Sequence, residues 1–229
     1  MRVSQVSLLH EYMDRSAAAS PDKTALVFKK QRFTWSEVHA QVGRIANSLK
    51  ELGLQRGDRV VIYLDNSPEL ALGIFAAMAA DGIFVVVNAQ TKADKLAYVL
   101  NDCRAKIIIT DKVLESFYTS ALEQAKHLEH AIIIDRGDTA KIAHVVCHDF
   151  VATVGAAKPE WPAQLRIPTD LAAIIYTSGS TGDPKGVMLT HQNMVAAAES
   201  ITTYLENKPD DIVLCVLPLS FDYGLYQWL

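Results

Sequence analysis

Short runs of apolar, mostly β-branched residues alternate along this chain with segments whose apolar residues recur at helical spacing. Runs this continuous are typical of strands buried on both faces of a parallel sheet, and the helical segments are typical of helices that cover such a sheet. The predicted strands are 59–63, 83–87, 106–110 and 131–134. This order predicts an α/β fold, with layered parallel or mixed sheets that are flanked by helices and joined by right-handed crossovers.

Capping signals mark the ends of several predicted helices. Residues 34–37, Thr-Trp-Ser-Glu, have the form of a capping box, and Gly53 is a suitable C-terminal stop for the helix that this box begins. Ser67 followed by Pro68 predicts the start of a second helix. Further helices are expected from Val6 to Ala19, from Thr91 to Cys103 and from Thr190 onward.

Three other segments are interpreted from their local patterns. Residues 24–33 are predicted to form a small hairpin. Residues 211–217, Asp-Ile-Val-Leu-Cys-Val-Leu, are predicted to form a final buried strand. The segment 149–169 has little periodicity and contains three prolines, so it is interpreted as a linker or a surface excursion.

The composition limits the classes to which this protein can belong. A chain of 229 residues, half of them hydrophobic, can form one large domain or two small domains with a real core. The net charge of −4, with no cluster of Lys or Arg, gives no basic field for nucleic acid or anionic lipid. No apolar run reaches the ~18 residues of a membrane span. Cys103, Cys147 and Cys215 are isolated, which favours reduced thiols and a cytoplasmic location, and no Cys/His spacing predicts a metal site.

A glycine-rich segment, Tyr176 to Val187, is the strongest functional signal in the chain. Its sequence is Tyr-Thr-Ser-Gly-Ser-Thr-Gly-Asp-Pro-Lys-Gly-Val, and it lies between an apolar run and a β-prone run. Glycines let backbone N–H groups approach phosphate oxygens, hydroxyls add donors, and Lys185 adds a mobile positive charge. The segment therefore predicts a polyphosphate-binding loop between two strands.

The spacing differs from that of the P-loop nucleotide hydrolases, in which Gly-x-x-x-x-Gly-Lys-Ser/Thr leads into a helix. Here Asp183 and Pro184 separate Gly182 from Lys185, and glycine follows the lysine. Because proline fixes φ and lacks an N–H donor, this stretch is interpreted as a turn that closes a strand–loop–strand hairpin. A nucleotide hydrolase is therefore a weaker alternative.

The whole of 171–187 resembles the phosphate-binding signature of the adenylate-forming superfamily, which contains acyl-CoA synthetases, luciferases and the adenylation domains of peptide synthetases. Scaffold motifs precede it in the family's order. Residues 33–38 resemble its Leu-Thr-Tyr-x-Glu-Leu motif, 57–60 its Gly-Asp-Arg-Val turn, and 78–88 its buried Leu-Lys-Ala-Gly-Ala-Ala-Tyr-Val-Pro segment. The resemblance covers most of the chain and implies the N-terminal portion of the adenylate-forming fold.

The resemblance also implies a reaction. A small carboxylic acid reacts with ATP to give an acyl-adenylate and pyrophosphate, and the acyl group then passes to the thiol of CoA or of a carrier protein's phosphopantetheine. Mg²⁺ accompanies ATP and neutralises its phosphates. The residues implied to bind β- and γ-phosphate are Thr177, Ser178, Gly179, Ser180, Thr181 and Gly182. Lys185 is implied to meet the departing pyrophosphate, although an ion pair that ties the loop to an acidic neighbour is an equal alternative.

A second segment, Phe221-Asp222-Tyr223-Gly224, resembles the Phe-Asp-x-Ser motif of amino-acid-activating domains, whose Asp meets the α-ammonium of the substrate. Asp222 and Tyr223 are therefore substrate-binding candidates. Gly224 departs from the motif, and Asp222 equally suits the N-cap of a helix that begins at Tyr223. His191 lies near a helix start and is assigned no role.

Several motifs of the family do not occur in this sequence. They are the adenine-binding Tyr-Gly-x-Thr-Glu segment, the ribose-binding aspartate, the hinge and the catalytic lysine of the mobile C-terminal domain. Residues 1–229 are therefore expected to be the incomplete N-terminal part of the large AMP-binding domain and to be inactive by themselves in ATP–pyrophosphate exchange. Two alternatives stand beside the acyl ligase: an amino-acid-activating domain that feeds a carrier protein, and a truncated, non-catalytic binding module.

Overall fold

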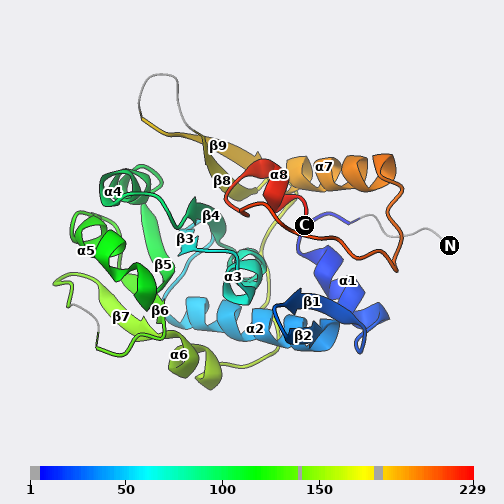
Figure 1. Cartoon of the computed structure of the whole chain (residues 1–229), viewed down its shortest axis with the longest axis horizontal. Helices are drawn as coiled ribbons and strands as arrows, with labels where there is room; N and C mark the ends of the chain where they lie inside the picture. Colours follow the sequence, from blue (N-terminus) through cyan, green and yellow to red (C-terminus); the bar gives the residue numbers. More distant parts are fainter. Residues whose placement is uncertain (1–5, 139–140, 178–182) are drawn as a thin grey trace.

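The computed structural model of the chain describes residues 6–138, 141–177 and 183–229. These residues form a seven-stranded sheet, in the order β7-β6-β5-β3-β4-β8-β9, and a separate two-stranded hairpin (Figure 1). The strands are β1 Thr24–Phe28, β2 Gln31–Thr34, β3 Arg59–Leu64, β4 Ile83–Asn88, β5 Ala105–Asp111, β6 His130–Ile134, β7 Val146–Asp149, β8 Leu171–Thr177 and β9 Lys185–Thr190. The large sheet is parallel except for β9, which confirms the predicted mixed α/β fold.

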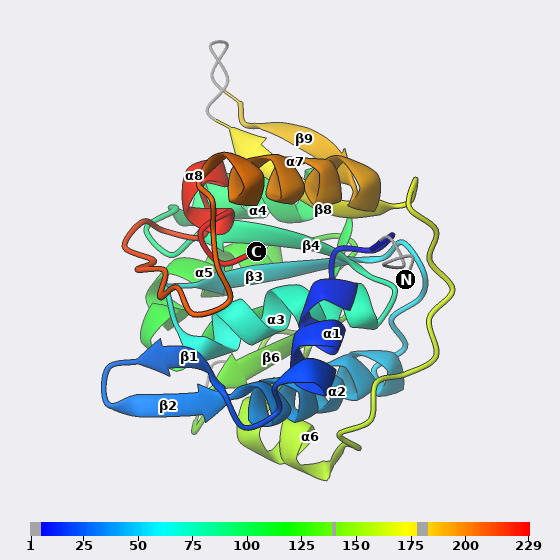
Figure 2. The ribbon, with the colours of Figure 1, turned by 90° about the vertical axis from the view of Figure 1, so that its right-hand side faces the viewer.

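Helices cover both faces of this sheet, and Figure 2 shows α1, α2 and α3 in front of it. The helices are α1 Glu11–Ala19, α2 Trp35–Glu51, α3 Pro68–Ala79, α4 Ala93–Asp102, α5 Glu115–Glu123, α6 Phe150–Ala156, α7 His191–Tyr204 and α8 Asp222–Leu225, with a 3₁₀ turn at Lys112–Leu114. Helices α1, α2, α3, α6 and α7 pack on one face, and α4 and α5 pack on the other. Within the described ranges, no helix combines the length and the apolarity needed to cross a bilayer.

The central strands are buried on both faces because helices cover each side. In β3, Val60 and Ile62 pack toward α2 and α3, whereas Val61 and Tyr63 pack toward α4 and α5. All four side chains are fully buried, and each such burial contributes roughly 1.5–3 kcal/mol. Double-sided burial explains why β3 is a continuous apolar run and not an alternating one.

The sheet changes its winding direction beside β3. Helix α3 joins β3 to β4 across one face, whereas α4 crosses the opposite face from β4 to β5, which lies on the far side of β3. The loops that leave the carboxyl ends of β3 and β4 therefore turn toward opposite faces and leave a crevice between them. Open α/β sheets bind ligands at such a point.

The predicted helix caps are confirmed. Thr34 accepts a hydrogen bond from Glu37 N and completes a capping box at the start of α2. Ser67 caps α3 and Thr190 caps α7, each through its side-chain oxygen. Gly53, at the end of α2, has a φ of +82°, which a residue with a side chain rarely adopts.

The first helix is shorter than the sequence pattern predicted. Helix α1 begins at Glu11 and not at Val6. The Glu11 carboxylate accepts a hydrogen bond from Ser7 N at 2.9 Å, and Leu9 in the preceding turn is buried in the core. The side chain of Glu11 thus satisfies the Ser7 N–H ahead of the helix, and the helix begins at Glu11.

The segment interpreted as a linker, 149–169, is ordered along α2. It contains α6, Phe150–Ala156, which the sequence pattern did not predict. Beyond α6, the Arg44 guanidinium donates to Ala157 O at 2.6 Å. A Cβ on Gly43 would lie 2.6 Å from the carbonyl carbon of Pro159, so the chain crosses α2 at backbone contact distance. Contacts with a distant helix, which local periodicity does not encode, hold this segment.

The prediction of a buried strand over 211–217 is wrong. Within the described chain, residues 211–216 pair with no strand, and Ile212 and Leu214 are 95% and 76% exposed. A β-prone run becomes a strand only where a neighbour offers free backbone groups and apolar cover. The chain returns to the core after this segment, where Leu219 and Leu225 are buried.

Candidate functional site

An antiparallel hairpin carries the glycine-rich segment. Strands β8 and β9 pair as far as Tyr176 opposite Gly186 and Thr177 opposite Lys185. The predicted strand–loop–strand arrangement is therefore confirmed for the two strands. Five of the residues implied to bind phosphate lie outside the described residues: Ser178, Gly179, Ser180, Thr181 and Gly182.

Thr177 and Lys185 stand at the open ends of the two hairpin strands. Both are exposed, and the Thr177 hydroxyl donates to Lys185 O at 3.5 Å. Among the described residues, the Lys185 ammonium forms no ion pair. The alternative in which Lys185 ties the loop to an acidic neighbour therefore has no support in that part of the chain. An exposed ammonium that pairs with no described carboxylate is available to an anionic ligand.

A cavity of about 580 Å³ lies between this hairpin and the start of α4. It exists because β8 diverges from β4: in the described chain the two strands pair only through Phe84 and Ala173. The cavity is lined by the carboxyl end of β4, the first turns of α4, the ends of the hairpin strands and residues 220–221. The predicted phosphate-binding hairpin therefore borders a space large enough for a small ligand.

Two cations, Lys92 and Lys95, and one carboxylate, that of Asp94, line this cavity. Lys92 immediately precedes α4, and Lys95 lies in its first turn. Neither forms an ion pair with the rest of the described chain. Thr91, Thr177 and Ser220 also line the cavity with their hydroxyl side chains. Ammonium groups beside hydroxyls complement phosphate and carboxylate groups.

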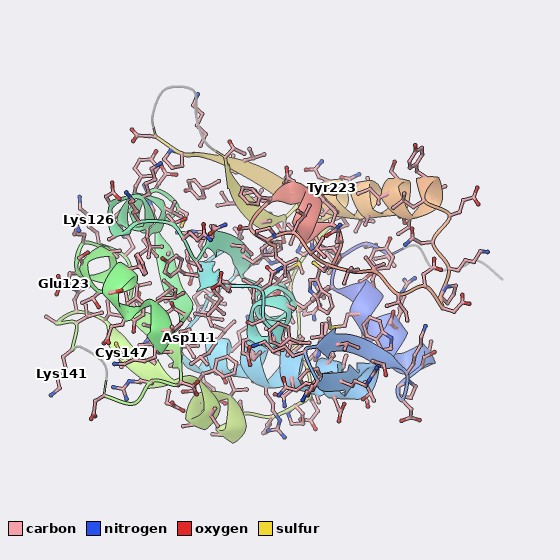
Figure 3. The ribbon with its side chains drawn as sticks, viewed as in Figure 1. Asp111, Glu123, Lys126, Lys141, Cys147 and Tyr223 are labelled. Atoms are coloured by element: carbon pink, nitrogen blue, oxygen red, sulfur yellow. The ribbon has the colours of Figure 1, made fainter. Side chains whose placement is uncertain are left out.

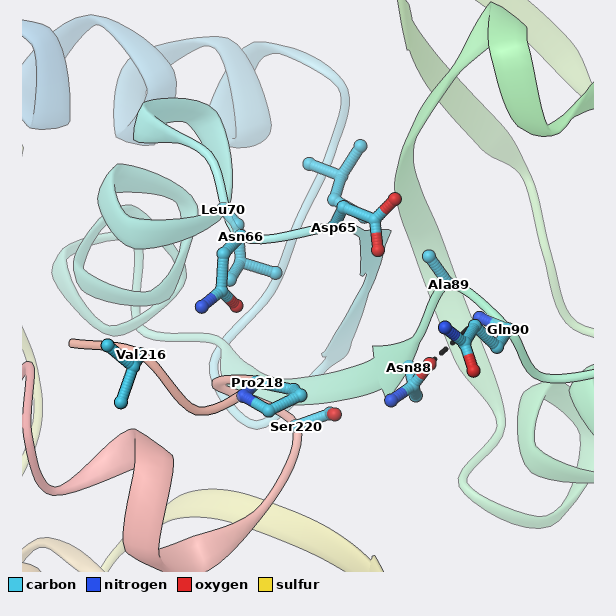
Figure 4. A pocket seen from close by; sticks show the side chains of 10 residues that line it. Asp65, Asn66, Leu70, Asn88, Ala89, Gln90, Val216, Pro218 and Ser220 are labelled. Atoms are coloured by element: carbon cyan, nitrogen blue, oxygen red, sulfur yellow. Dashed lines mark hydrogen bonds between the residues drawn. The ribbon is translucent and has the colours of Figure 1, made fainter. Parts of the chain in front are cut away.

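A second cavity, of about 280 Å³, occupies the crevice between the ends of β3 and β4 (Figure 4). Asp65 and Asn66 follow β3 on one side, and Asn88 and Gln90 stand at the end of β4 on the other. Asn88 Oδ1 accepts a hydrogen bond from Gln90 N at 2.8 Å, which holds this turn closed. Asn88, Gln90 and Ser220 line both cavities, so the two spaces adjoin.

Asn66 anchors the far wall of the smaller cavity. Its amide donates to Leu217 O at 2.9 Å and accepts from Leu219 N at 3.0 Å. Asn66 and Asn88 line the site although no sequence motif marks them. The available signal was their position, because each is a polar residue at the carboxyl end of a buried strand where an α/β sheet binds ligands.

The sequence profile of a protein family described as AMP-binding enzyme matches this chain over residues 13–229. The chain belongs to the AMP-binding enzyme family. Bacitracin synthase 1 of Bacillus licheniformis is 32% identical to it over 96% of this chain and 4% of that protein. The long-chain-fatty-acid–CoA ligase of Bacillus subtilis is 31% identical over 95% of this chain and 43% of the ligase.

A solved structure has the same fold as this chain. The crystal structure of ATP-bound MatB from Rhodopseudomonas palustris superposes with a TM-score of 0.81 at 26% identity, over 97% of this chain and 42% of MatB. The chain thus spans less than half the length of these relatives, and its fold is the N-terminal part of the adenylate-forming fold.

The second segment that suggested this family, 221–224, forms the start of α8. Asp222 is the first residue of that helix and is exposed. Tyr223, labelled in Figure 3, is 72% exposed. The alternative in which Asp222 N-caps the helix is wrong, because Phe221 is the N-cap and no side chain caps this end.

Gly224 has a packing reason for departing from the family's Phe-Asp-x-Ser motif. A Cβ at this position would overlap Pro218 O and lie 2.9 Å from the Pro218 carbonyl carbon and 3.1 Å from Leu217 O. Backbone atoms cannot yield as a flexible side chain can. The close turn over 217–224 therefore excludes the serine of the amino-acid-activating motif.

His191 is a buried structural residue of this AMP-binding domain. Its Nδ1 accepts a hydrogen bond from Leu9 N at 3.3 Å, and its ring makes an edge contact with His10. Burial, together with the nearby His10 and Arg166, lowers the pKa of His191 to about 3. The imidazole is therefore neutral near pH 7, and it ties the start of α7 to the segment before α1.

The described residues contain no group of three or more His, Cys, Asp or Glu side chains that could hold a metal ion. The polar groups at the larger cavity are the ammonium groups of Lys92 and Lys95, several hydroxyl and amide groups, and the Asp94 carboxylate. The ammonium groups outnumber the carboxylate, and with the hydroxyl and amide groups they suit an anionic ligand.

Proposed function

We propose that the protein activates a small carboxylic acid with ATP, releases pyrophosphate, and transfers the acyl group from the adenylate to a thiol. The observation that carries this proposal is the exposed Lys185 ammonium, which forms no ion pair with the described residues, on a hairpin that borders the 580 Å³ cavity. The fatty-acid–CoA ligase and the ATP-bound MatB structure support it by their similarity.

ATP supplies the electrophilic phosphorus and the pyrophosphate leaving group. Under this proposal, the chain's residues bind the phosphates and offset their charge. Thr177, Ser178, Ser180 and Thr181 donate hydroxyl hydrogen bonds to β- and γ-phosphate oxygens, and Gly179 and Gly182 donate backbone N–H groups. Lys185 places its positive charge beside the departing pyrophosphate. The exposed Thr177 and Lys185 fit these roles.

We propose that Mg²⁺ accompanies ATP. Since the described residues offer no carboxylate cluster for a cation, we propose that phosphate oxygens and water hold the ion, which Mg²⁺ accepts readily. The ion supplies additional charge neutralisation at the phosphates.

The proposed thiol acceptor is CoA or the phosphopantetheine of a carrier protein. Both carry phosphate groups, which the Lys92 and Lys95 ammonium groups at the cavity complement. We place the protein in the cytoplasm, where thiols stay reduced. Its three cysteines, Cys103, Cys147 and Cys215, are all free.

An amino acid is the second candidate substrate. Similarity to bacitracin synthase 1 and the exposed Asp222 carboxylate at the start of α8 favour it. Under this alternative, replacing Asp222 by Ala weakens use of an amino acid far more than use of its des-amino analogue. The glycine at 224 argues against it, because the motif's serine does not fit there.

We further propose that residues 1–229 are the N-terminal part of the large AMP-binding domain. The relatives' greater length and the exposed Ile212 and Leu214 support this. On this proposal the 229 residues alone show negligible ATP–pyrophosphate exchange, and robust exchange by them contradicts it.

The test of the proposed function is ATP–pyrophosphate exchange by the native protein from its source, with a panel of fatty, aromatic and amino acids. Exchange that requires a carboxylic acid, and that falls in Lys185→Ala but not in the remote Lys141→Ala, supports the ligase. Phosphate release without any acid favours a nucleotide hydrolase. No exchange, with an intact mass near 25.2 kDa, favours a non-catalytic binding module.

A further inference from the structure

Tyr176 links the glycine-rich hairpin to a helix across the cavity. Its hydroxyl donates a hydrogen bond to the carboxylate of Asp102, the last residue of α4. Burial and this hydrogen bond raise the pKa of Tyr176, so the phenol keeps its proton and acts as the donor. The contact joins two of the elements that line the 580 Å³ cavity.

The Asp102 carboxylate does not stabilise the C-terminal end of α4. A carboxylate at a helix C-terminus lies at the negative end of the helix dipole and is unfavourable there. The neighbouring Asn101 already serves this helix end, since its amide donates to Ala97 O and to Gln124 O. The hydrogen bond that the structure gives to the Asp102 carboxylate is the one from Tyr176.

The ring of Tyr176 also fixes the second strand of the hairpin. Gly186 is its cross-strand partner, and a Cβ there would lie 3.2 Å from the Tyr176 Cζ and 3.4 Å from its hydroxyl oxygen. The ring therefore lies against the backbone of β9. One hydrogen bond at its tip holds both strands relative to α4.

The hairpin needs such a contact because the sheet does not hold its end. Strand β8 leaves the β4 ladder at Ala173, so Ile174 to Thr177 extend past the last pair with β4. The cavity opens in the resulting gap. Beyond Ala173, the hydrogen bond between Tyr176 and Asp102 connects β8 to α4.

We propose that Tyr176 and Asp102 are positioning residues that set the hairpin against α4 and thereby place Thr177 and Lys185 for the triphosphate. This inference rests on the proposed function, because the ligand that Thr177 and Lys185 would bind is the triphosphate of ATP. It does not require that Tyr176 or Asp102 touch the nucleotide. The hydrogen bond between Tyr176 and Asp102 is called the tether below.

The experiment measures MgATP binding to the 229-residue chain by calorimetry, together with its melting temperature and amide exchange of β9. Tyr176→Phe removes one oxygen atom, and Asp102→Ala removes the acceptor. We expect each to raise the dissociation constant about threefold to tenfold, the range for a partly exposed hydrogen bond to a charged group. The double variant should lose no more than either single variant, and Asp102→Asn, which keeps a neutral acceptor, should recover part of the affinity.

Tyr12→Phe is the matched control. Its hydroxyl also donates to a carboxylate, that of Glu199 at 3.0 Å, but this bond joins α1 to α7. The control should leave MgATP affinity and β9 exchange unchanged. Faster β9 exchange in Tyr176→Phe at an unchanged melting temperature supports positioning. Wild-type affinity and exchange in both Tyr176→Phe and Asp102→Ala overturn it.

The two proposals fail differently. If the wild-type chain and the native protein from its source both bind no MgATP, the proposed function is wrong. In that case amide exchange still tests the tether, and unaltered β9 exchange in Tyr176→Phe refutes it. If the wild-type chain binds MgATP and the variants bind equally well, the tether alone is wrong.

Discussion

Tyr176 lies directly over Gly186, its cross-strand partner, at the point where the hairpin leaves the sheet. A Cβ on Gly186 would lie 2.8 Å from Ile174 Cγ2 as well as 3.2 Å from the Tyr176 ring. Gly186 is not among the described residues with positive φ. Packing, and not an unusual backbone angle, therefore requires glycine here.

Gly186→Ala should destabilise the hairpin by about 1–2 kcal/mol, since one methyl group must displace two side chains. The measurement is amide exchange across β8 and β9, together with thermal unfolding. Gly155→Ala is the control, because a Cβ at this helical glycine of α6 meets nothing within 4 Å. That change should be neutral or slightly stabilising. Equal effects of the two substitutions would count against the packing argument.

Lys92 and Lys95 should contribute to anion binding at the larger cavity. The double variant Lys92→Gln/Lys95→Gln is expected to weaken binding of inorganic pyrophosphate about fivefold at low salt, and less at high salt because ions screen exposed charges. Calorimetry at two salt concentrations measures this. Lys126→Gln/Lys141→Gln, two remote positions labelled in Figure 3, is the charge-matched control. A similar loss in both double variants would show that net charge alone matters.

Stability should fall as the pH decreases below the ordinary pKa of histidine. The pKa of His191 is lowered to about 3 in the folded chain by burial, whereas in the unfolded chain it is about 6.5. The unfolded state therefore binds a proton first, and stability that is present above pH 6.5 is lost as the pH falls toward 3. Each pH unit in that window should cost about 1.4 kcal/mol.

His191→Asn tests this pH dependence, because its amide oxygen can still accept the hydrogen bond from Leu9 N. Urea unfolding from pH 7.5 to 4.5 should give a flatter profile for this variant than for the wild-type chain. His127→Asn changes an exposed histidine and should leave the wild-type slope unchanged. Parallel profiles for His191→Asn and wild type would refute the assignment.

Gly224→Ser should disrupt the turn before α8, although it restores the family's Phe-Asp-x-Ser motif. The added Cβ would meet the Pro218 backbone, so the turn must open at a cost of about 2–3 kcal/mol. Thermal unfolding and amide exchange over 217–226 measure the effect. Gly224→Ala should behave in the same way, because Cβ and not the hydroxyl causes the overlap. A stable Gly224→Ser variant would contradict this packing argument and favour the hypothesis that Asp222 binds the ammonium group of an amino-acid substrate.

The sequence by itself determined the elements whose signals are local. Apolar runs such as 59–63 became buried strands, and the caps at Thr34, Ser67 and Thr190 began helices where predicted. The β-prone runs on either side of the glycine-rich stretch paired as the antiparallel strands β8 and β9, because they lie close together in the sequence. Short-range hydrogen bonds and backbone preferences are sufficient for features of this kind.

Only the tertiary structure decided which segments meet. The same apolar composition gave a buried strand at β3 but left Ile212 exposed, because only β3 has neighbouring strands and helical cover. Strand order, which opens the crevice beside Asn66 and Asn88, and the bond from Tyr176 to Asp102, residues far apart in the chain, follow from long-range packing. Local patterns fix how a segment folds, whereas the pairing of distant surfaces fixes where its side chains act.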